Sequence, residues 1–320
     1  MTERLDVFMG RANAAYYATR DPFADFTTAP EISQVFGEIL GIWSAVVWQS
    51  MGAPAQVILA EAGPGRGTLM TDALRAIARV APEFGRALRV HLVENSKALR
   101  AVQAVKLDAQ WHDRVEDIPA GPMILLANEF LDALPIRQFV RRASWHERYV
   151  SDGIFVERPV EVDLPQTAEG AVRERCEPAL ALARHLSARL ASQGGAALFL
   201  DYGPATSGEG SSLQALRDGA PCNPLVEPGT ADLTAHVDFA ALAAAANGMS
   251  VHGPEPQGKF LARLGLFQRT AILARSLSPE AAARMRDGAS RLAEPDGMGR
   301  LFKALALCHP SLPQPPGFSE

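Results

Sequence analysis

Hydrophobic residues in this chain form short apolar runs that alternate with longer amphipathic stretches. The short runs are typical of buried parallel strands, and the amphipathic stretches are typical of helices packed on a sheet. Strands are expected at 56–62, 88–94, 109–115, 123–130, 194–203, 249–253 and 301–308. Helices are expected at 30–52, 68–80, 96–106, 171–193, 237–247 and across 258–293. The alternation predicts an α/β fold, with a mainly parallel sheet between two layers of helices.

Two regions interrupt this alternation. Residues 138–160 alternate with period two around a Ser-Asp-Gly turn at 151–153, which predicts an inserted β-hairpin. Residues 203–230 are rich in Gly, Ser and Pro, and long loops of this kind often carry function. We therefore divide the chain into a helical cap or lid (1–54), the first part of the core (55–136), an inserted hairpin and helix (137–193), the rest of the core with a substrate-side loop (194–310) and a tail (311–320).

The turn after the first predicted strand carries an acidic residue and three alternate glycines. Glu61 is followed by Gly63, Gly65 and Gly67, and a helix begins at once. Glycines allow a ligand to approach the backbone, and a helix start offers free N–H groups. Thr68 stands where a dinucleotide fingerprint needs another glycine, and no P-loop lysine is nearby. The motif resembles the first motif of class I S-adenosylmethionine (SAM) methyltransferases, although a tight turn without a ligand would use the same glycines.

A second acidic residue closes the next predicted strand. Glu94 lies about one βαβ unit beyond the glycines. A carboxylate at this place can accept hydrogen bonds from both ribose hydroxyls of a bound nucleoside. A solvated surface glutamate is the alternative.

Composition removes several classes of function. The chain has 320 residues, 48% of them hydrophobic, and a formal net charge of −5. It has no basic stripe for nucleic acid, no run of 18 apolar residues for a membrane span, and no secretory apolar segment at its start. Its three cysteines have neither metal-binding nor disulfide spacing, so we expect no metal site and a reducing compartment.

Nine segments together resemble the MidA-like methyltransferase family, which includes a mitochondrial assembly factor that methylates an arginine in a core subunit of respiratory complex I. The matching stretches are YYATRDPF (16–23), DFTTAPEISQVFGE (25–38), EAGPGRGTL (61–69), HLVENS (91–96), ANEFLDALPIRQF (127–139), FLDYG (199–203), DLTAHVDF (232–239), QGKFLARLG (257–265) and MGRLFKALAL (298–307). In one respect the chain departs from the family: Phe23-Ala24-Asp25 replaces a longer glycine-rich linker.

The resemblance implies a class I Rossmann-like fold with a seven-stranded, mainly parallel sheet. It implies SAM as cofactor, S-adenosylhomocysteine as product and a protein arginine as acceptor, on a complex I core subunit. The expected compartment is the bacterial cytoplasm, or the mitochondrial matrix for an organellar protein. A homodimer is a candidate assembly.

The stretch at the end of the 123–130 strand supplies the main catalytic candidates. Ligands of open α/β sheets bind outside the carboxyl ends of the strands. We expect Asn128 at the cofactor edge, and Glu129 with Asp132 holding the acceptor guanidinium through paired hydrogen bonds. Alternatively, Asp132 caps the following turn and Asn128 satisfies buried backbone groups. His236 is the best histidine candidate for acid–base chemistry, although a structural role near Asp238 is slightly favoured.

The remaining candidates depend more on the resemblance. The resemblance implies that Asp113 approaches the adenine, and an ordinary loop acid without a ligand is an equal alternative. On the acceptor side, the resemblance implies a lid and a channel formed by Tyr17, Thr28, Pro30, Glu31, Asp201 and Tyr202. Tyr16 is a further candidate for the lid, and for both tyrosines simple packing is at least as good an interpretation. With the cofactor-binding set of Glu61, Gly63, Gly65, Gly67, Thr68, Glu94, Asp113 and Asn128, these residues complete the expected site.

Three other functions remain open at this point. The chain could methylate a small molecule, or bind SAM as an assembly chaperone without catalysis. A Rossmann-type nucleotide binder of another kind is disfavoured by Thr68.

Overall fold

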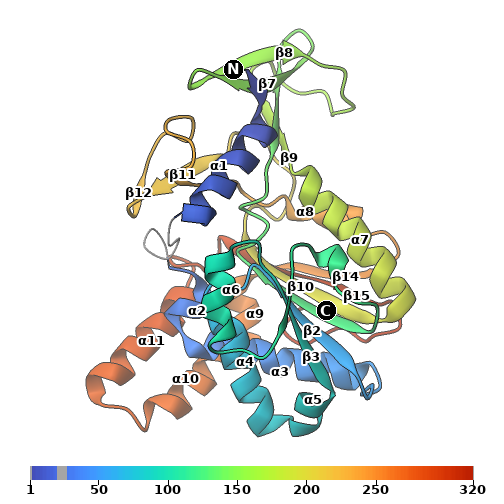
Figure 1. Cartoon of the computed structure of the whole chain (residues 1–320), viewed down its shortest axis with the longest axis vertical. Coiled ribbons are helices and arrows are strands. Elements are labelled where there is room, and N and C mark those ends of the chain that lie inside the picture. The colour runs from blue at the N-terminus through green and yellow to red at the C-terminus, as the bar shows by residue number, and fades with distance from the viewer. Residues whose placement is uncertain (1, 20–26, 320) are drawn as a thin grey trace.

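The computed structural model describes residues 2–19 and 27–319, which form a lower α/β layer and an upper tier of small sheets around one helix (Figure 1). The lower sheet has seven strands in the order β14-β15-β10-β5-β2-β3-β4. Their bounds are β2 (Val57–Ala62), β3 (Leu88–Val93), β4 (Gln110–His112), β5 (Met123–Asn128), β10 (Gly195–Tyr202), β14 (Ser250–Pro256) and β15 (Phe302–Cys308). Only β15 runs antiparallel to its neighbours, so the predicted seven-stranded, mainly parallel sheet is confirmed.

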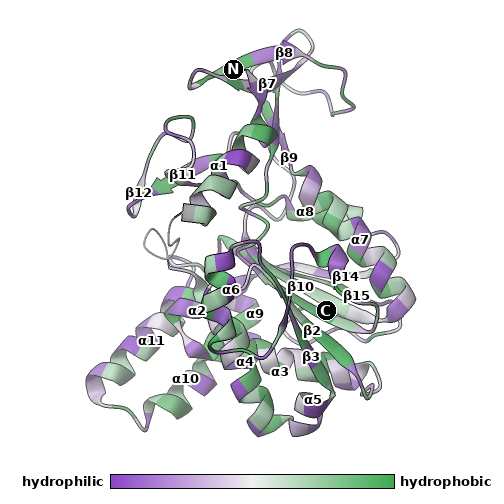
Figure 2. Cartoon of the chain, in the orientation of Figure 1, coloured by the Kyte–Doolittle hydropathy of each residue, from purple (hydrophilic) through white to green (hydrophobic). Residues whose placement is uncertain are grey.

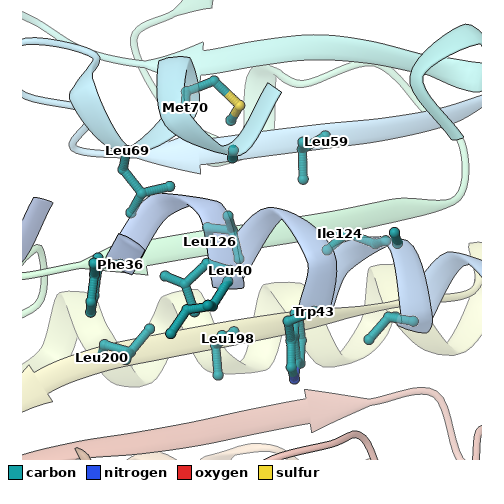
Figure 3. Packing of buried hydrophobic residues seen from close by; sticks show 14 of the residues in the cluster. Phe36, Leu40, Trp43, Leu59, Leu69, Met70, Ile124, Leu126, Leu198 and Leu200 are labelled. Carbon is teal, nitrogen blue, oxygen red and sulfur yellow. The ribbon is translucent and has the colours of Figure 1, made fainter. Parts of the chain in front are cut away.

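Helices cover both faces of this sheet, each with its own apolar cluster. On one face α3 (Gln34–Ser50) directs Phe36, Leu40 and Trp43 toward Leu59 of β2 and Leu198 of β10 (Figure 3). On the other face lie α7 (Glu177–Gln193) and α8 (Phe239–Ala245). Fully burying one such large apolar side chain stabilises a fold by about 1.5–3 kcal/mol. Both faces of the core strands are therefore apolar, as their green colour in Figure 2 shows.

Two glycines bring α3 close to α4 (Thr68–Val80), the helix that follows the glycine turn. A Cβ on Gly37 would lie 2.8 Å from the Leu69 carbonyl oxygen, and one on Gly41 would lie 2.7 Å from Cα of Ala73. The absence of a side chain at both positions permits this packing. Further helices of the lower layer are α5 (Pro82–Ala87), α6 (Lys97–Ala104), α9 (Gln257–Arg263), α10 (Leu266–Ala274) and α11 (Pro279–Ala293).

The upper tier has a separate core. Here α1 (Leu5–Thr19) packs Leu5, Phe8 and Met9 against apolar residues of two antiparallel sheets. The five-stranded sheet contains β1 (Glu3–Arg4), β6 (Arg137–Arg141), β7 (Trp145–Ser151), β8 (Ile154–Pro159) and β9 (Val172–Arg175). The three-stranded sheet contains β11 (Gln214–Arg217), β12 (Ala220–Pro221) and β13 (Asp232–Thr234). The upper tier therefore combines the N-terminus with two segments that interrupt the core pattern.

The predicted hairpin is confirmed as β7 and β8, with left-handed backbone at Asp152 and Gly153 in its turn. Two expected elements were wrong in extent. The helix expected from 171 begins at Glu177, because 172–175 form β9 beside the distant β6. The stretch 203–230 is not a simple loop, because it contains β11 and β12.

The helix expected over 30–52 is divided in two. Ser33 is extended, with φ −153°, and separates α2 (Ala29–Ile32) from α3. Its side-chain oxygen accepts a hydrogen bond from the Val35 N–H, which starts α3 as an N-cap residue does. Pro30 lies in the first turn of α2, as its fixed φ favours. The short linker 23–25 lies outside the described residues. Among the described helices, none is long and apolar enough to span a membrane.

Candidate active site

A cavity of about 720 Å³ lies at the carboxyl ends of β2, β3 and β5, and α1 of the upper tier forms part of its wall. This is the edge at which open α/β sheets bind ligands. The expected site residues on its wall are Tyr17, Thr28, Pro30, Glu31, Glu61, Gly63, Gly65, Thr68, Glu94, Asp113, Asn128 and Glu129. The structure thus gathers most of the candidates around one space.

The glycine turn needs glycine at each of its three positions. Gly63, Gly65 and Gly67 have φ values of 68°, 54° and 75°, in the left-handed region. A Cβ on Gly63 would lie 2.9 Å from the ring of Phe130. Gly63 and Gly65 line the cavity, whereas Gly67 precedes α4 as its N-cap residue. The turn therefore presents bare backbone to a ligand, with the start of α4 beside it.

Glu61 is buried within the wall. The side chain is 2% exposed, and one of its oxygens, Oε2, has no hydrogen-bond partner in the part of the chain that the structure describes. Burial raises the pKa of Glu61 to about 8, against the opposing hydrogen bond from the Met70 backbone. An unpartnered buried oxygen is costly, so a cationic or N–H-bearing ligand group at this place would stabilise it.

Glu94 is held in position at the end of β3. Its Oε1 accepts a hydrogen bond from the Ser96 N–H at 2.8 Å, and its Oε2 lies 3.4 Å from Nε2 of Gln103. Gln103 also donates to the carbonyl oxygen of Gly65 at 2.7 Å. Burial raises the pKa of Glu94, and its hydrogen bonds oppose that rise. The carboxylate therefore faces the cavity at a fixed distance from the glycine turn.

Sequence reasoning missed Gln103, which connects these two parts of the site. The only available signal was a polar residue within the expected helix 96–106, and that signal is weak. Its side chain is fully buried, and its Oε1 accepts a hydrogen bond from the Trp111 indole N–H at 2.8 Å. Asp113 lies farther out at the rim, where its 74% exposed side chain pairs with Arg100 at 2.5 Å.

Asn128 and Glu129 form the polar end of β5. Glu129 has φ +48°, a conformation that costs a non-glycine residue about 1–3 kcal/mol and is common at functional sites. Its N–H donates to the Leu200 carbonyl, and its Oε1 accepts from the Ala29 N–H at 2.9 Å and from Asn128 Nδ2 at 3.0 Å. Burial raises the pKa of Glu129. The Oδ1 of Asn128 is buried and has no partner among the described residues.

The segment around α2 closes one side of the cavity. Glu31 Oε1 accepts a hydrogen bond from the Thr68 hydroxyl at 2.5 Å, and the neighbouring Ala29 N–H is bonded to Glu129. Tyr17 of α1 also lines the cavity, and its hydroxyl donates to Asp232 Oδ1 at 2.7 Å. The contacts of Glu31 and Ala29 join α2 to the start of α4 and to the end of β5, and the Tyr17 contact joins α1 to β13.

Besides Gly67, four expected residues do not belong to the described cavity wall: Asp132, Asp201, Tyr202 and His236. Asp132 is buried behind it, and burial with the nearby Asp201 and Asp232 carboxylates raises the Asp132 pKa well above its ordinary value. The Oδ1 of Asp132 is also without a partner among the described residues. His236 is exposed, with its ring edge against Tyr202 at 5.5 Å between centroids.

Asp201 holds the turn that follows β5. Its Oδ2 accepts hydrogen bonds from the backbone N–H groups of Phe130, Leu131 and Asp132, at 3.2, 2.9 and 3.3 Å. Burial raises the pKa of Asp201 to about 7. The Tyr202 hydroxyl is bonded to Thr234 of the upper tier. The end of β10 therefore supports the turn after β5, and neither Asp201 nor Tyr202 lines the described cavity.

The residues present fit SAM. The glycine turn leaves room for its methionine part, the buried Oε2 of Glu61 can receive an N–H donor, and Glu94 offers a carboxylate to ribose hydroxyls. An acidic wall also suits a cationic sulfonium. Six acids line the cavity (Glu31, Glu61, Glu94, Asp113, Glu116 and Glu129) against two basic residues (Arg66 and Arg114).

Comparisons with known proteins agree with this geometry. Residues 39–255 match the model of a family described as "Putative S-adenosyl-L-methionine-dependent methyltransferase". The protein arginine methyltransferase NDUFAF7 homolog of Drosophila melanogaster mitochondria is 36% identical, over 92% of this chain and 78% of that protein. The human mitochondrial protein arginine methyltransferase NDUFAF7 is 33% identical, over 91% and 76%.

A solved structure gives the same result for the fold and cofactor. A Burkholderia thailandensis protein crystallised with S-adenosyl-homocysteine superposes with a TM-score of 0.81 at 26% identity. The match covers 99% of this chain and 90% of the other.

Proposed function

This chain belongs to the MidA-like family of SAM-dependent methyltransferases, and on that premise we propose that it methylates an arginine side chain of a protein. The acceptor protein that we propose is a core subunit of respiratory complex I. The compartment would be the bacterial cytoplasm, or the mitochondrial matrix for an organellar protein, since the curated relatives are mitochondrial.

One observation supports arginine as the acceptor more than any other. At the end of β5, Asn128 donates from Nδ2 to Oε1 of Glu129, and its own Oδ1 is buried without a partner in the described part of the chain. Only Oε1 of that carboxylate has hydrogen-bond donors in the described part of the chain. A guanidinium is a planar cation with several N–H donors, so it suits two neighbouring acceptors. The same pair would leave a neutral, donor-poor acceptor without such contacts.

The reaction requires a cation to approach another cation. Bound SAM supplies an electrophilic methyl group on a positively charged sulfur. Arginine keeps its proton up to a pKa above about 12, so repulsion opposes the encounter. Glu129 offsets that repulsion and fixes the plane of the guanidinium, so that one nitrogen faces the methyl carbon. Such positioning can lower a barrier by about 7–11 kcal/mol.

Glu129 is also placed to receive a proton. As the nitrogen–carbon bond forms, the carbon–sulfur bond breaks and sulfur keeps the electron pair. The methylated nitrogen then returns to its ordinary charge by losing one proton, for which the Glu129 carboxylate is the adjacent acceptor. The raised pKa of Glu129 favours proton uptake at this step, because burial already disfavours its charged form.

Labelled SAM tests the proposal. The protein is incubated with methyl-labelled SAM and an extract of cells that lack the gene, and the label is located by peptide mass spectrometry. We expect it on an arginine of a complex I subunit. Label on another protein would remove the complex I assignment, label on a metabolite would favour a small-molecule enzyme, and no label with intact SAM binding would favour a non-catalytic chaperone.

A further inference from the structure

Helix α1 has two faces with different partners. Leu5, Phe8, Met9, Ala12 and Tyr16 are buried in the upper tier. The residues that line the cavity recur three or four positions apart, as one side of a helix requires: Gly10, Asn13, Ala14, Tyr17 and Ala18. Three of these five have the smallest side chains, and Ala14 and Ala18 are exposed within the cavity. The face of α1 toward the cavity is therefore open and largely apolar.

Asn13 fixes this face against the turn that follows β5. Its Nδ2 donates to the carbonyl oxygens of Ala133 at 3.0 Å and Leu233 at 2.8 Å, and its Oδ1 accepts from the Leu233 N–H at 3.0 Å. All three bonds cross more than one hundred residues of sequence. All three hydrogen bonds of the Asn13 side chain are made to backbone groups. Asn13 therefore positions α1 and is not available to bind a substrate.

The helix and the turn meet in one continuous surface. A Cβ on Gly10 would lie 3.8 Å from Cγ of Pro135, which is ordinary van der Waals contact. We define the α1 wall as Gly10, Ala14 and Ala18 together with Leu134 and Pro135, all of which line the cavity. None of these five side chains carries a polar atom, so the wall offers contact to hydrocarbon and no hydrogen bond.

The polar end of β5 opens into the same cavity as this wall. Asn128 is 7% exposed; its Nδ2 donates to Oε1 of Glu129, its buried Oδ1 has no partner among the described residues, and both residues line the cavity. The cavity therefore combines an apolar strip of small residues with a buried pair of acceptors. A long side chain with a hydrocarbon stem and a cationic, donor-rich head is complementary to this arrangement, because the stem can contact the apolar strip while the head donates to the acceptors.

We propose that the α1 wall holds the hydrocarbon stem of the acceptor arginine while Asn128 and Glu129 hold its head. This inference rests on the proposed function and adds the part of the site that admits the acceptor. The small residues of α1 set the width available, so the acceptor arginine must project from an exposed or extended segment of its protein.

Binding of a minimal acceptor tests the wall without turnover. The probe is N-acetyl-arginine methylamide, added to the full-length protein saturated with S-adenosylhomocysteine and followed by ligand-observed NMR. Ala14→Phe places a ring in the open part of the wall, and we expect it to weaken probe binding about tenfold or more. Val7→Phe is the matched control, because Val7 is exposed on α1 and is not part of the cavity wall. The affinity for S-adenosylhomocysteine should be unchanged in both variants.

The outcomes separate the wall from the proposed function. Equal probe binding by wild type and Ala14→Phe, or no probe binding by wild type, overturns the wall. If wild type labels a protein arginine and Ala14→Phe does so with unchanged kcat/KM, the proposed role of the α1 wall is wrong and the proposed methylation of arginine is retained. If wild type binds the probe and Ala14→Phe does not, but wild type labels no protein arginine, the proposed methylation of arginine is wrong and the α1 wall is retained as a binding subsite.

Discussion

The half of the cavity that we propose for the nucleoside (the nucleoside half) and the half that we propose for the acceptor (the acceptor half) are assembled in different ways. The nucleoside half comes from one stretch of about fifty residues, in which Glu61, the glycines, Glu94 and Asp113 follow consecutive strands. The acceptor half joins segments at least one hundred residues apart, through the Ala29–Glu129 and Asn13–Ala133 hydrogen bonds. The nucleoside half thus depends on local supersecondary structure, whereas the acceptor half depends on contacts between segments that are distant in sequence.

Backbone strain shows the same contrast. In the nucleoside half, left-handed φ values fall on glycines, which adopt them at little cost. In the acceptor half, Glu129 itself has φ +48°. A conformation of this kind persists only where the surroundings over-determine it, and here they do so through Leu200, Ala29 and Asn128. The Glu129 carboxylate is therefore held by tertiary contacts, and its position is sensitive to them.

Glu129→Gln is expected to have the largest effect of the substitutions in either half. The amide keeps the shape and one acceptor oxygen for the Ala29 N–H, but it loses the negative charge and the proton acceptor. Methyl transfer should fall by about 10²–10³-fold, the usual cost of removing one preorganised electrostatic partner. Single-turnover experiments with labelled SAM measure the rate of methyl transfer, and calorimetric titration measures the affinity for S-adenosylhomocysteine, so effects on the acceptor half and on the nucleoside half can be told apart.

The control for this variant is Glu280→Gln, which changes an exposed carboxylate in the first turn of α11. If Glu129→Gln kept the wild-type rate, the acceptor role of Glu129 would be wrong. If it lost S-adenosylhomocysteine binding as strongly as turnover, the two halves would not be separable as described.

Glu94→Ala tests the other half and should produce the reverse pattern. It would remove the two hydrogen bonds that we propose between Glu94 and the ribose hydroxyls, and charged hydrogen bonds contribute about 1.5–3 kcal/mol each when no compensation occurs. We expect the affinity for S-adenosylhomocysteine to fall about 10–100-fold, while the rate at saturating SAM changes less. Titration calorimetry measures this affinity, with Glu83→Ala as a control at an exposed position. Unchanged affinity would place the ribose elsewhere.

The same contrast explains what could be predicted from the sequence. The glycine turn, Glu94 and the seven-stranded sheet were predictable because each follows from residues adjacent along the chain. Sequence also placed Asn128 and Glu129 at a strand end, and both line the cavity. In contrast, Asp201 was expected beside the acceptor but bonds the backbone of the turn after β5, since a strand-end carboxylate can face either side.

Residues that act through distant partners were missed altogether. Gln103 looked like any polar helix residue, and only the folded chain shows it between Gly65 and Glu94. Asn13 gave no signal, because its partners lie 120 and 220 residues away. The strand β9 was read as helix for the same reason: its pairing with β6 is not a local property of 172–175.

Asp201→Asn should have the smallest effect, and one that depends on pH. Burial raises the folded-state pKa of Asp201 to about 7 from an ordinary value of 3.8, so the folded protein retains a proton that the unfolded chain releases. Stability from this group is complete below the unfolded pKa and is lost as pH rises through about 7. Wild type should therefore lose stability between about pH 5 and pH 8, and the uncharged asparagine should lose less.

The amide also has a fixed cost in the folded state. One of the two oxygens of Asp201 accepts three N–H groups and the other accepts the Tyr202 N–H, so an NH₂ must face a donor in either orientation. At about pH 5 the variant should be less stable by about 1 kcal/mol, and the difference should shrink or reverse toward about pH 8. Urea denaturation across this range measures it, with Glu83→Gln as the exposed control. A difference that stays constant with pH would mean that Asp201 remains charged, and that the turn after β5 carries a buried negative charge beside the acceptor.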